Sequence, residues 1–335
     1  MRLLYVLLAN VAIFGCVNAF KILVYSPKIG HSHSNFMGRI ADTLVAAGHN
    51  VTTLIPCGTQ SIADGTTKSN VVHVVPDAET TALFDSVLNG DDFDPFIESN
   101  FNPIGSFVQG KVFGEIFAKL CRATVNQNEI LDRLRADAFD IMIAEPFDVC
   151  GIGMAPYIAP KSLALVSSSV LLPVMYNYLG VPKAVVSSFA FPEGAIEAVL
   201  RERFGQDHPS IASIASQAAV AFTNGEPLLN VAAPTLHKIV DIAGLGAKEP
   251  KALDKKWLDI LALRPRTVLI SFGSIAKSYM LKPEAKSAIL KTVAHFPDVT
   301  FIWKYEKLED DFALREAVKL QNLVLSNWMP QNDLL

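Results

Sequence analysis

The feature that most constrains the fold is a strand pattern, a helix pattern and a second strand pattern that follow one another near the N-terminus. Residues 21–26 form a short apolar run before Pro27, which is typical of a buried strand. Apolar residues recur at helical spacing through residues 34–47, and Gly48 stands where a helix stop is expected. Residues 51–55 are predicted to form the next strand. This order predicts a βαβ unit, and therefore a parallel sheet covered by helices.

Similar patterns continue along the chain. Further strands are predicted at residues 71–75, 139–144, 163–167 and 218–222, and a mostly helical stretch at residues 113–134. A second series has predicted strands at residues 267–271, 299–304 and 323–326 and a helix at residues 282–295. We therefore expect two α/β domains, and the second has too few strands to be a complete doubly wound domain.

The boundaries follow from composition. Residues 246–265 are charged and carry prolines near both ends, so they are predicted to connect a first domain, 20–245, to a second, 266–335. The last residues read as the start of a helix without its end, and we expect the chain to be a fragment or a truncated product.

The first 19 residues are predicted to be a secretory signal peptide. Arg2 supplies the charged start, residues 3–15 the apolar run, and residues 17–19 a small-residue cleavage site. A membrane anchor is the alternative, but the run is shorter than the ~20 residues that a span needs. In the secretory pathway Asn50, in the sequon Asn50-Val51-Thr52, is a candidate for N-glycosylation.

Charge and cysteine content exclude several classes. The chain has a formal net charge of −4 and shows no basic stripe, so nucleic acid is not an expected partner. After the predicted leader three cysteines remain, Cys57, Cys121 and Cys150, and this odd, sparse count argues against a disulfide framework while leaving one bridge open. No metal-ligand spacing is present, and no metal site is expected.

Three glycine-containing stretches do not match phosphate or nucleophile motifs. Residues 105–112 place Val112 where a P-loop needs Ser or Thr, and no strand precedes them. Residues 151–156 lack the third glycine of a dinucleotide fingerprint, and residues 271–274 are not a nucleophile elbow. Kinase, NAD-dependent and hydrolase functions therefore have no support.

Two histidines follow the first predicted strand. His31 and His33 lie where open α/β sheets place their ligands, at the carboxyl end of a parallel strand. The positive end of the following helix disfavours imidazolium, and a neutral imidazole there can act as a general base. The surrounding sequence does not show which of His31 and His33 would be the base. A loop histidine with no function is the commoner case and is the alternative for both. His49, at the far end of the helix, is predicted to be structural.

A catalytic histidine needs an orienting acceptor, commonly a carboxylate. Glu145 ends the predicted strand at residues 139–144 and therefore lies at the same edge of the sheet as the histidines. Asp148 is a nearby candidate for the same role. The alternative for both residues is that they are solvated acids in a loop.

Specific motifs resemble a known family. Ser32-His33 is followed sixteen residues later by the histidine of Gly48-His49-Asn50-Val51-Thr52. The stretches "FDIMIAEPFDVCG" at 139–151, "TVLISFGS" at 267–274 and "NWMPQNDLL" at 327–335 are further landmarks. Together they resemble UDP-glycosyltransferases of the UDP-glucuronosyltransferase type, particularly the nematode branch, across nearly the whole mature chain. The spacing selects His33, and Glu145 stands where many members have aspartate.

The resemblance implies a GT-B architecture with two Rossmann-like domains, the C-terminal one incomplete here. It implies an inverting, metal-independent transfer of glucuronic acid or glucose to a hydroxyl of a small lipophilic acceptor, as in detoxification. UDP-sugar would be a co-substrate, and no cofactor is expected. His33 would be the base and Glu145 its partner. Ser274 would lie by the phosphates, Trp328 would stack on uracil and Gln331 would bind the nucleotide.

The resemblance also implies an enzyme of the ER lumen, whose full-length form is held in the membrane by a C-terminal helix that these residues lack. Homo- or hetero-oligomers are left open. Residues 184–216 fit the family poorly, and the chain ends inside the family signature. Two hypotheses follow: an incomplete glycosyltransferase sequence, with the 335 residues expected to be inactive alone, or a non-catalytic binding or regulatory subunit.

Overall fold

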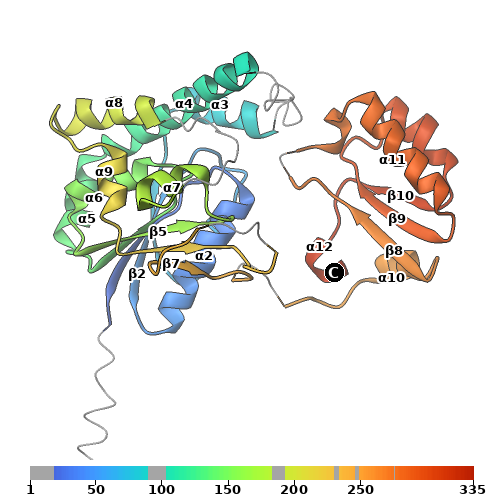
Figure 1. Cartoon of the computed structure of the whole chain (residues 1–335), viewed down its shortest axis with the longest axis horizontal. Helices are drawn as coiled ribbons and strands as arrows, with labels where there is room; N and C mark the ends of the chain where they lie inside the picture. The colour runs from blue at the N-terminus through green and yellow to red at the C-terminus, as the bar shows by residue number, and fades with distance from the viewer. Residues whose placement is uncertain (1–18, 90–102, 183–192, 230–233, 246–248, 275) are drawn as a thin grey trace, which may run out of the picture. The chain divides into compact units, whose positions relative to one another are not determined.

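The structure is a computed structural model that describes residues 19–89, 103–182, 193–229, 234–245, 249–274 and 276–335. The chain forms two compact units, with the main boundary between residues 246 and 247. Each unit is α/β, and each is described by itself (Figure 1). The predicted signal peptide, apart from Ala19, lies outside the described residues.

The first unit alternates strands and helices in chain order. Its strands are β1 (Lys21–Tyr25), β2 (Asn50–Pro56), β3 (Asn70–Val74), β4 (Ile141–Ala144), β5 (Ser162–Ser167), β6 (Val220–Thr223) and β7 (Ile239–Asp241). The helices up to residue 246 are α2 (His31–Ala46), α3 (Ala78–Asn89), α4 (Pro103–Val125), α5 (Asn128–Ala136), α6 (Cys150–Ile158), α7 (Pro173–Leu179), α8 (Glu193–Phe204) and α9 (Ile211–Ser216).

The seven strands form one parallel sheet in the order β3-β2-β1-β4-β5-β6-β7. From β1 the chain first builds outward through β2 and β3, and then returns to β4 on the other side of β1. The strand order therefore reverses between β1 and β4, and ligands of open α/β sheets bind outside the carboxyl ends of strands at such a point. The register pairs Tyr25 with Ala144, so these two strands end level with each other.

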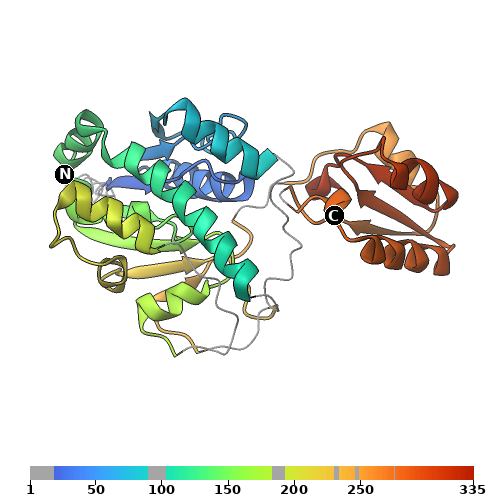
Figure 2. The ribbon, with the colours of Figure 1, turned by 90° about the horizontal axis from the view of Figure 1, so that it is seen from above.

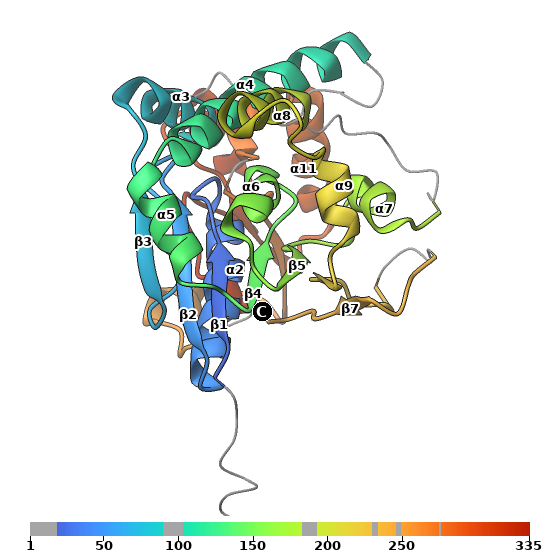
Figure 3. The same ribbon diagram turned by 90° about the vertical axis from the view of Figure 1, so that its left-hand side faces the viewer.

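Helices cover both faces of this sheet, as a parallel sheet requires. Successive side chains of a strand point to opposite faces. Ile22 and Val24 pack against Phe36, Met37 and Ile40 of α2 in one core cluster. Figure 3 shows α5 and α6 on the other face, and Figure 2 shows the long α4 beside α8. The helix that carries His33 is thus fixed by its own apolar stripe.

The second unit contains a three-stranded parallel sheet in the order β10-β9-β8. Its elements are α10 (Lys255–Leu261), β8 (Arg266–Ile270), η1 (Ser278–Met280), α11 (Pro283–His295), β9 (Val299–Lys304), η2 (Phe312–Glu316), η3 (Ala317–Lys319), β10 (Leu323–Ser326) and α12 (Gln331–Leu334). Trp257 of α10 packs with Ile302 and Met329 in a core cluster. The helix of the predicted connecting segment is therefore part of this unit's core.

Most predicted elements are present with small shifts at their ends. Three differences have physical reasons. Helix α2 begins at His31, ahead of the apolar periodicity, because its first turn is polar. The helical stretch predicted at 113–134 is two helices, α4 and α5, separated at residues 126–127. Strand β7 was not predicted, because it has only three residues and two of them are exposed.

Two sequence expectations are clarified by the fold. Residues 105–112 lie within α4, so they form no phosphate loop. Of the stretch that fits the family poorly, residues 184–192 lie outside the described residues, and α8 and α9 account for much of the remainder. Within the described parts of the chain, no helix is both long and apolar enough to cross a membrane.

A close backbone approach holds α2 in place. A Cβ on Gly38 would lie 2.0 Å from the backbone carbon of Gly65, and Gly65 itself has a φ of 78°. The same loop donates the backbone N–H groups of Thr67 and Lys68 to the Asp42 carboxylate of α2. Only glycine fits at position 38 without moving this loop.

We therefore expect Gly38→Ala to destabilise the protein by about 3 kcal/mol, because the methyl group overlaps backbone that cannot move aside easily. Gly194→Ala, in helix α8 with open space around its Cβ, is the matched control and should be neutral or slightly stabilising. Urea unfolding of both variants measures the difference. Equal stabilities would show that the two segments do not pack as described.

Candidate active site

His33 lies in the first turn of α2, beyond the carboxyl end of β1. Gly30, in extended conformation, precedes the helix, and its carbonyl accepts the N–H of Ser34. The His33 side chain is 16% exposed, so it is sheltered yet still open to solvent, whereas His31 is exposed.

Glu145 directly follows β4 and meets His33 at the point where the strand order reverses. Its carboxylate oxygens lie 2.9 and 2.8 Å from His33 Nδ1, and its side chain is only 2% exposed. The structure therefore brings together the predicted pair across 112 residues of sequence. His31 is not part of this contact.

Ser168, which was not predicted from the sequence, completes the arrangement. Its backbone N–H donates to Glu145 Oε1 at 3.0 Å, and its Oγ lies 3.0 Å from His33 Nδ1. It follows β5, the strand next to β4. The available signal was the run Ser167-Ser168-Ser169 at the end of an apolar strand, which places polar groups at the same sheet edge.

These contacts determine what the imidazole can do. A neutral imidazole donates from one nitrogen and accepts at the other, and the carboxylate only accepts. Nδ1 therefore carries the proton in the His33–Glu145 bond, and Nε2 keeps a lone pair. The Phe147 ring lies against the imidazole, with centroids 4.4 Å apart. The site can accept a proton at Nε2 and stabilise the resulting imidazolium.

Asp148, the competitor of Glu145, has a different partner. The Tyr25 hydroxyl donates to Asp148 Oδ2 at 2.7 Å, and the N–H of Cys150 donates to Oδ1 at 3.0 Å. Burial raises the pKa of the Asp148 carboxyl to about 6 despite these hydrogen bonds, and the neighbouring Glu145 adds to the rise. Burial, with the Asp148 charge, raises the pKa of Tyr25 well above its ordinary value. Asp148 thus stabilises the turn that carries Glu145.

A disulfide joins Cys121 of α4 to Cys150, the first residue of α6, and Cys57 remains free and buried. The one bridge that the cysteine count left open is therefore present. Gly151 lies against the Tyr25 ring, where a Cβ would be 2.3 Å from Cδ1. The bridge and this contact both hold the C-terminal end of the turn that presents Glu145.

The three residues predicted to bind the donor are in the second unit, at the carboxyl ends of its strands. Ser274 is exposed in the turn after β8, Trp328 is 69% exposed two residues after β10, and Gln331 is exposed at the start of α12. Strands β8 and β10 flank β9, so these residues share one edge of the sheet.

Asn50 is exposed at the first residue of β2, at the opposite edge of the first sheet from His33. Its side-chain oxygen accepts from the Asn70 amide at 3.4 Å. A glycan there would therefore extend away from the His33 edge.

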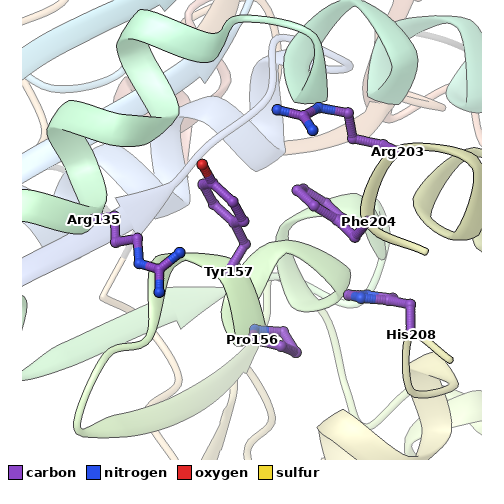
Figure 4. A pocket seen from close by; sticks show the side chains of 6 residues that line it. All are labelled: Arg135, Pro156, Tyr157, Arg203, Phe204 and His208. Atoms are coloured by element: carbon purple, nitrogen blue, oxygen red, sulfur yellow. The ribbon is translucent and has the colours of Figure 1, made fainter.

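A shallow pocket of about 340 Å³ lies where α5, α6 and α8 meet (Figure 4). Arg135 lies over the Tyr157 ring and Arg203 over the Phe204 ring, and the two rings stack with centroids 5.0 Å apart. The pocket is at the end of α6 opposite Cys150, so it is remote from Glu145. No group of three or more His, Cys, Asp or Glu that could hold a metal occurs among the described residues.

Comparison with known proteins shows the family to which the chain is similar. The family model described as "UDP-glucoronosyl and UDP-glucosyl transferase" matches residues 20–188 and 194–335. The relative ugt-47 of Caenorhabditis briggsae, described as a candidate UDP-glucuronosyltransferase, is 27% identical over 354 residues, covering 96% of this chain and 65% of its own. Human UDP-glucuronosyltransferase 3A2 is 25% identical, with 95% and 64% covered. The chain spans about two thirds of the length of such curated relatives.

Solved structures show the same fold. The glycosyltransferase SnogD from Streptomyces nogalater aligns with a TM-score of 0.56 at 19% identity, covering 94% of this chain and 74% of its own. UGT2 of Phytolacca americana, solved with UDP-2fluoro-glucose and pterostilbene, gives 0.52 at 12% identity, with 93% and 72% covered.

The chain is therefore an α/β protein of the GT-B class, built from two Rossmann-like units. It belongs to the UDP-glucoronosyl and UDP-glucosyl transferase family.

The disulfide gives a direct chemical prediction. Under denaturing conditions without a reductant, N-ethylmaleimide should label Cys57 and leave the peptides of Cys121 and Cys150 joined. After reduction all three should be labelled. Closing a loop with a sequence separation of 29 is worth about 3 kcal/mol or more, so Cys121→Ser should lower the free energy of unfolding by that order. Labelling of Cys121 before reduction would contradict the bridge.

The raised pKa of Asp148 gives a prediction on stability. Between about pH 4 and pH 6 the folded protein binds a proton at Asp148 that the unfolded chain does not, so this residue destabilises the fold as pH rises through 6. Asp148→Asn removes the charge; its side-chain oxygen can still accept from the N–H of Cys150, and its NH2 group can donate to the Tyr25 oxygen in place of the bond that Tyr25 donates in the wild type. The free energy of unfolding of Asp148→Asn, taken relative to wild type, should therefore be about 2 kcal/mol higher at pH 7 than at pH 4.5. Urea unfolding at the two pH values tests this, and an equal difference at both would contradict it.

Proposed function

We propose that the protein is an inverting glycosyltransferase that moves glucuronic acid or glucose from a UDP-sugar to a hydroxyl of a small lipophilic acceptor. The observation that carries the proposal is the His33–Glu145–Ser168 arrangement at the reversal point of the first sheet. Family membership supports a UDP-sugar as donor.

The proposed reaction uses Nε2 of His33, the ring nitrogen that is not hydrogen-bonded to Glu145. His33 Nε2 takes the proton of the acceptor hydroxyl while that oxygen attacks the anomeric carbon of the sugar. The bond from this carbon to the β-phosphate oxygen breaks, and UDP leaves with the electron pair. Attack and departure occur on opposite faces, so the configuration inverts. Glu145 holds Nδ1–H and stabilises the imidazolium, and Ser168 N–H holds Glu145. No metal is assigned a step.

The donor is proposed to bind the second unit. Trp328 would stack on the uracil, Gln331 would hydrogen-bond the nucleotide and Ser274 would contact the phosphates. All three are exposed at one sheet edge, which supports this assignment. The apolar acceptor would lie in the first unit, near His33 and the Phe147 ring.

The proposed setting is the secretory pathway, with the ER lumen as the place of action. The disulfide supports it, because disulfides persist in oxidising compartments. The exposed Asn50 of the sequon is consistent with glycosylation there.

The function is tested by substitution at the site. General-base assistance is worth ~10²–10⁴ in rate, so His33→Ala should lower transfer to 1-naphthol by that factor. Glu145→Gln should lose less, because the imidazole remains but is poorly oriented. Each substitution is made in a chain extended to the length of the curated relatives, because the 335 residues alone are expected to be inactive. UDP-glucuronic acid and UDP-glucose are assayed separately in microsomes from cells expressing each variant.

His31→Ala is the matched control, since His31 is exposed in the same helical turn. It should remain close to wild type, and UDP binding should be unchanged in all three variants. A severe loss in His31→Ala with an active His33→Ala would refute the assignment.

A further inference from the structure

Lys304 is a buried lysine at the end of the central strand of the second sheet. It is the last residue of β9, is 7% exposed, and pairs in register with Ser326 of β10. The loops that follow β8 and β10 lie on either side of it. These are the loops that carry Ser274 and Trp328.

The Lys304 ammonium contacts both of these loops. Its Nζ donates to the carbonyl of Gly273 at 2.5 Å and lies over the Trp328 ring, 5.4 Å from the centroid. Gly273 has a φ of 89°, a conformation that favours glycine, so this carbonyl belongs to a sharply defined turn next to Ser274. One cation thus joins the two predicted donor loops.

The charge of Lys304 is only partly neutralised. Glu306 Oε1 is 3.7 Å away, which is an ion pair but too long for a hydrogen bond, and the other oxygen of Glu306 accepts the N–H of Ser278 at 2.7 Å. Burying an ammonium costs free energy that packing alone does not return. The contacts of Lys304 with the Gly273 carbonyl and the Trp328 ring therefore account for its burial.

Trp328 is held on one side and open on the other. Ser326 Oγ donates to its carbonyl at 2.5 Å, and the next residue, Met329, is 3% exposed in the core. The indole itself remains 69% exposed. A cation over one face of the ring fixes the indole and leaves the other face available for stacking on a base.

We propose that Lys304 is a positioning residue of the donor site: it orders the turn at Gly273 and seats the Trp328 indole so that its free face receives the uracil. This inference rests on the proposed function of the second unit. Ordering the ring before binding removes a cost that the nucleotide would otherwise bear.

The test uses the full chain labelled with 5-fluorotryptophan. Its three tryptophans are Trp257, Trp303 and Trp328, and the first two are 5% and 0% exposed. Trp328→Phe assigns the third ¹⁹F signal. We expect Lys304→Met to shift and sharpen the Trp328 signal while the other two stay in place, which also shows that the variant is folded. Lys304→Arg should restore the wild-type signal.

Lys319→Met is the matched control, because Lys319 is a surface lysine of the same unit, paired with Glu316 at 3.3 Å. It should leave the Trp328 signal unchanged. Titrating uridine and UDP into each sample gives the affinities. Lys304→Met should weaken both ligands by about tenfold, which is within the range of one cation–π contact, because both carry the uracil.

The possible results distinguish the proposed donor site from the proposed role of Lys304. If UDP does not move the Trp328 signal of the wild type, the proposed donor site is wrong and Lys304 cannot serve it. If UDP binds the wild type and Lys304→Met equally well, the donor site stands and this inference fails. A loss confined to UDP would also overturn it, since Lys304 would then act on the phosphates and not through Trp328.

Discussion

The described site depends on one interaction, the hydrogen bond between His33 and Glu145. It joins a helix that follows β1 to a turn that follows β4, and it exists because these two strands are neighbours that end level with each other. The neighbours arise from the reversal of strand order in the sheet. The carboxylate determines that Nδ1 is protonated, and the nitrogen left free to accept a proton is therefore Nε2.

The turn that presents Glu145 is held by groups that have no role in the proposed proton transfer. Tyr25 and the N–H of Cys150 donate hydrogen bonds to Asp148, which lies in the same turn. The disulfide joins the end of the turn to α4, and the N–H of Ser168 donates to the Glu145 carboxylate. The Asp148 charge is buried at a cost in stability above pH 6. The turn that carries the proposed catalytic carboxylate is thus kept rigid by buried polar contacts, which is how preorganised sites retain their geometry.

Much of this could be predicted from the sequence. Local periodicity located six strands of the first sheet and the three of the second, and parallel strands place His33 and Glu145 at one edge without any knowledge of the strand order. Local sequence left both His31 and His33 as candidates, and only the resemblance to the family, through the spacing of Ser32-His33 to Gly48-His49, selected His33. What could not be predicted depends on contacts distant in sequence. The Ser168 N–H is a backbone group, the partner of Cys150 is set by how α4 crosses the sheet, and Asp148 could be separated from Glu145 only by its contact with Tyr25.

The central claim is that Glu145 holds His33 in the tautomer that leaves Nε2 unprotonated. Long-range ¹H–¹⁵N correlation spectra of protein labelled with ¹⁵N-histidine measure this directly, with His33→Ala to assign the signals. Above the pH at which the ring loses its second proton, the account predicts a protonated Nδ1 and an unprotonated Nε2 for His33, and a mixture of tautomers in Glu145→Ala. A protonated Nε2 in the wild-type protein, or an unchanged tautomer in Glu145→Ala, would contradict it.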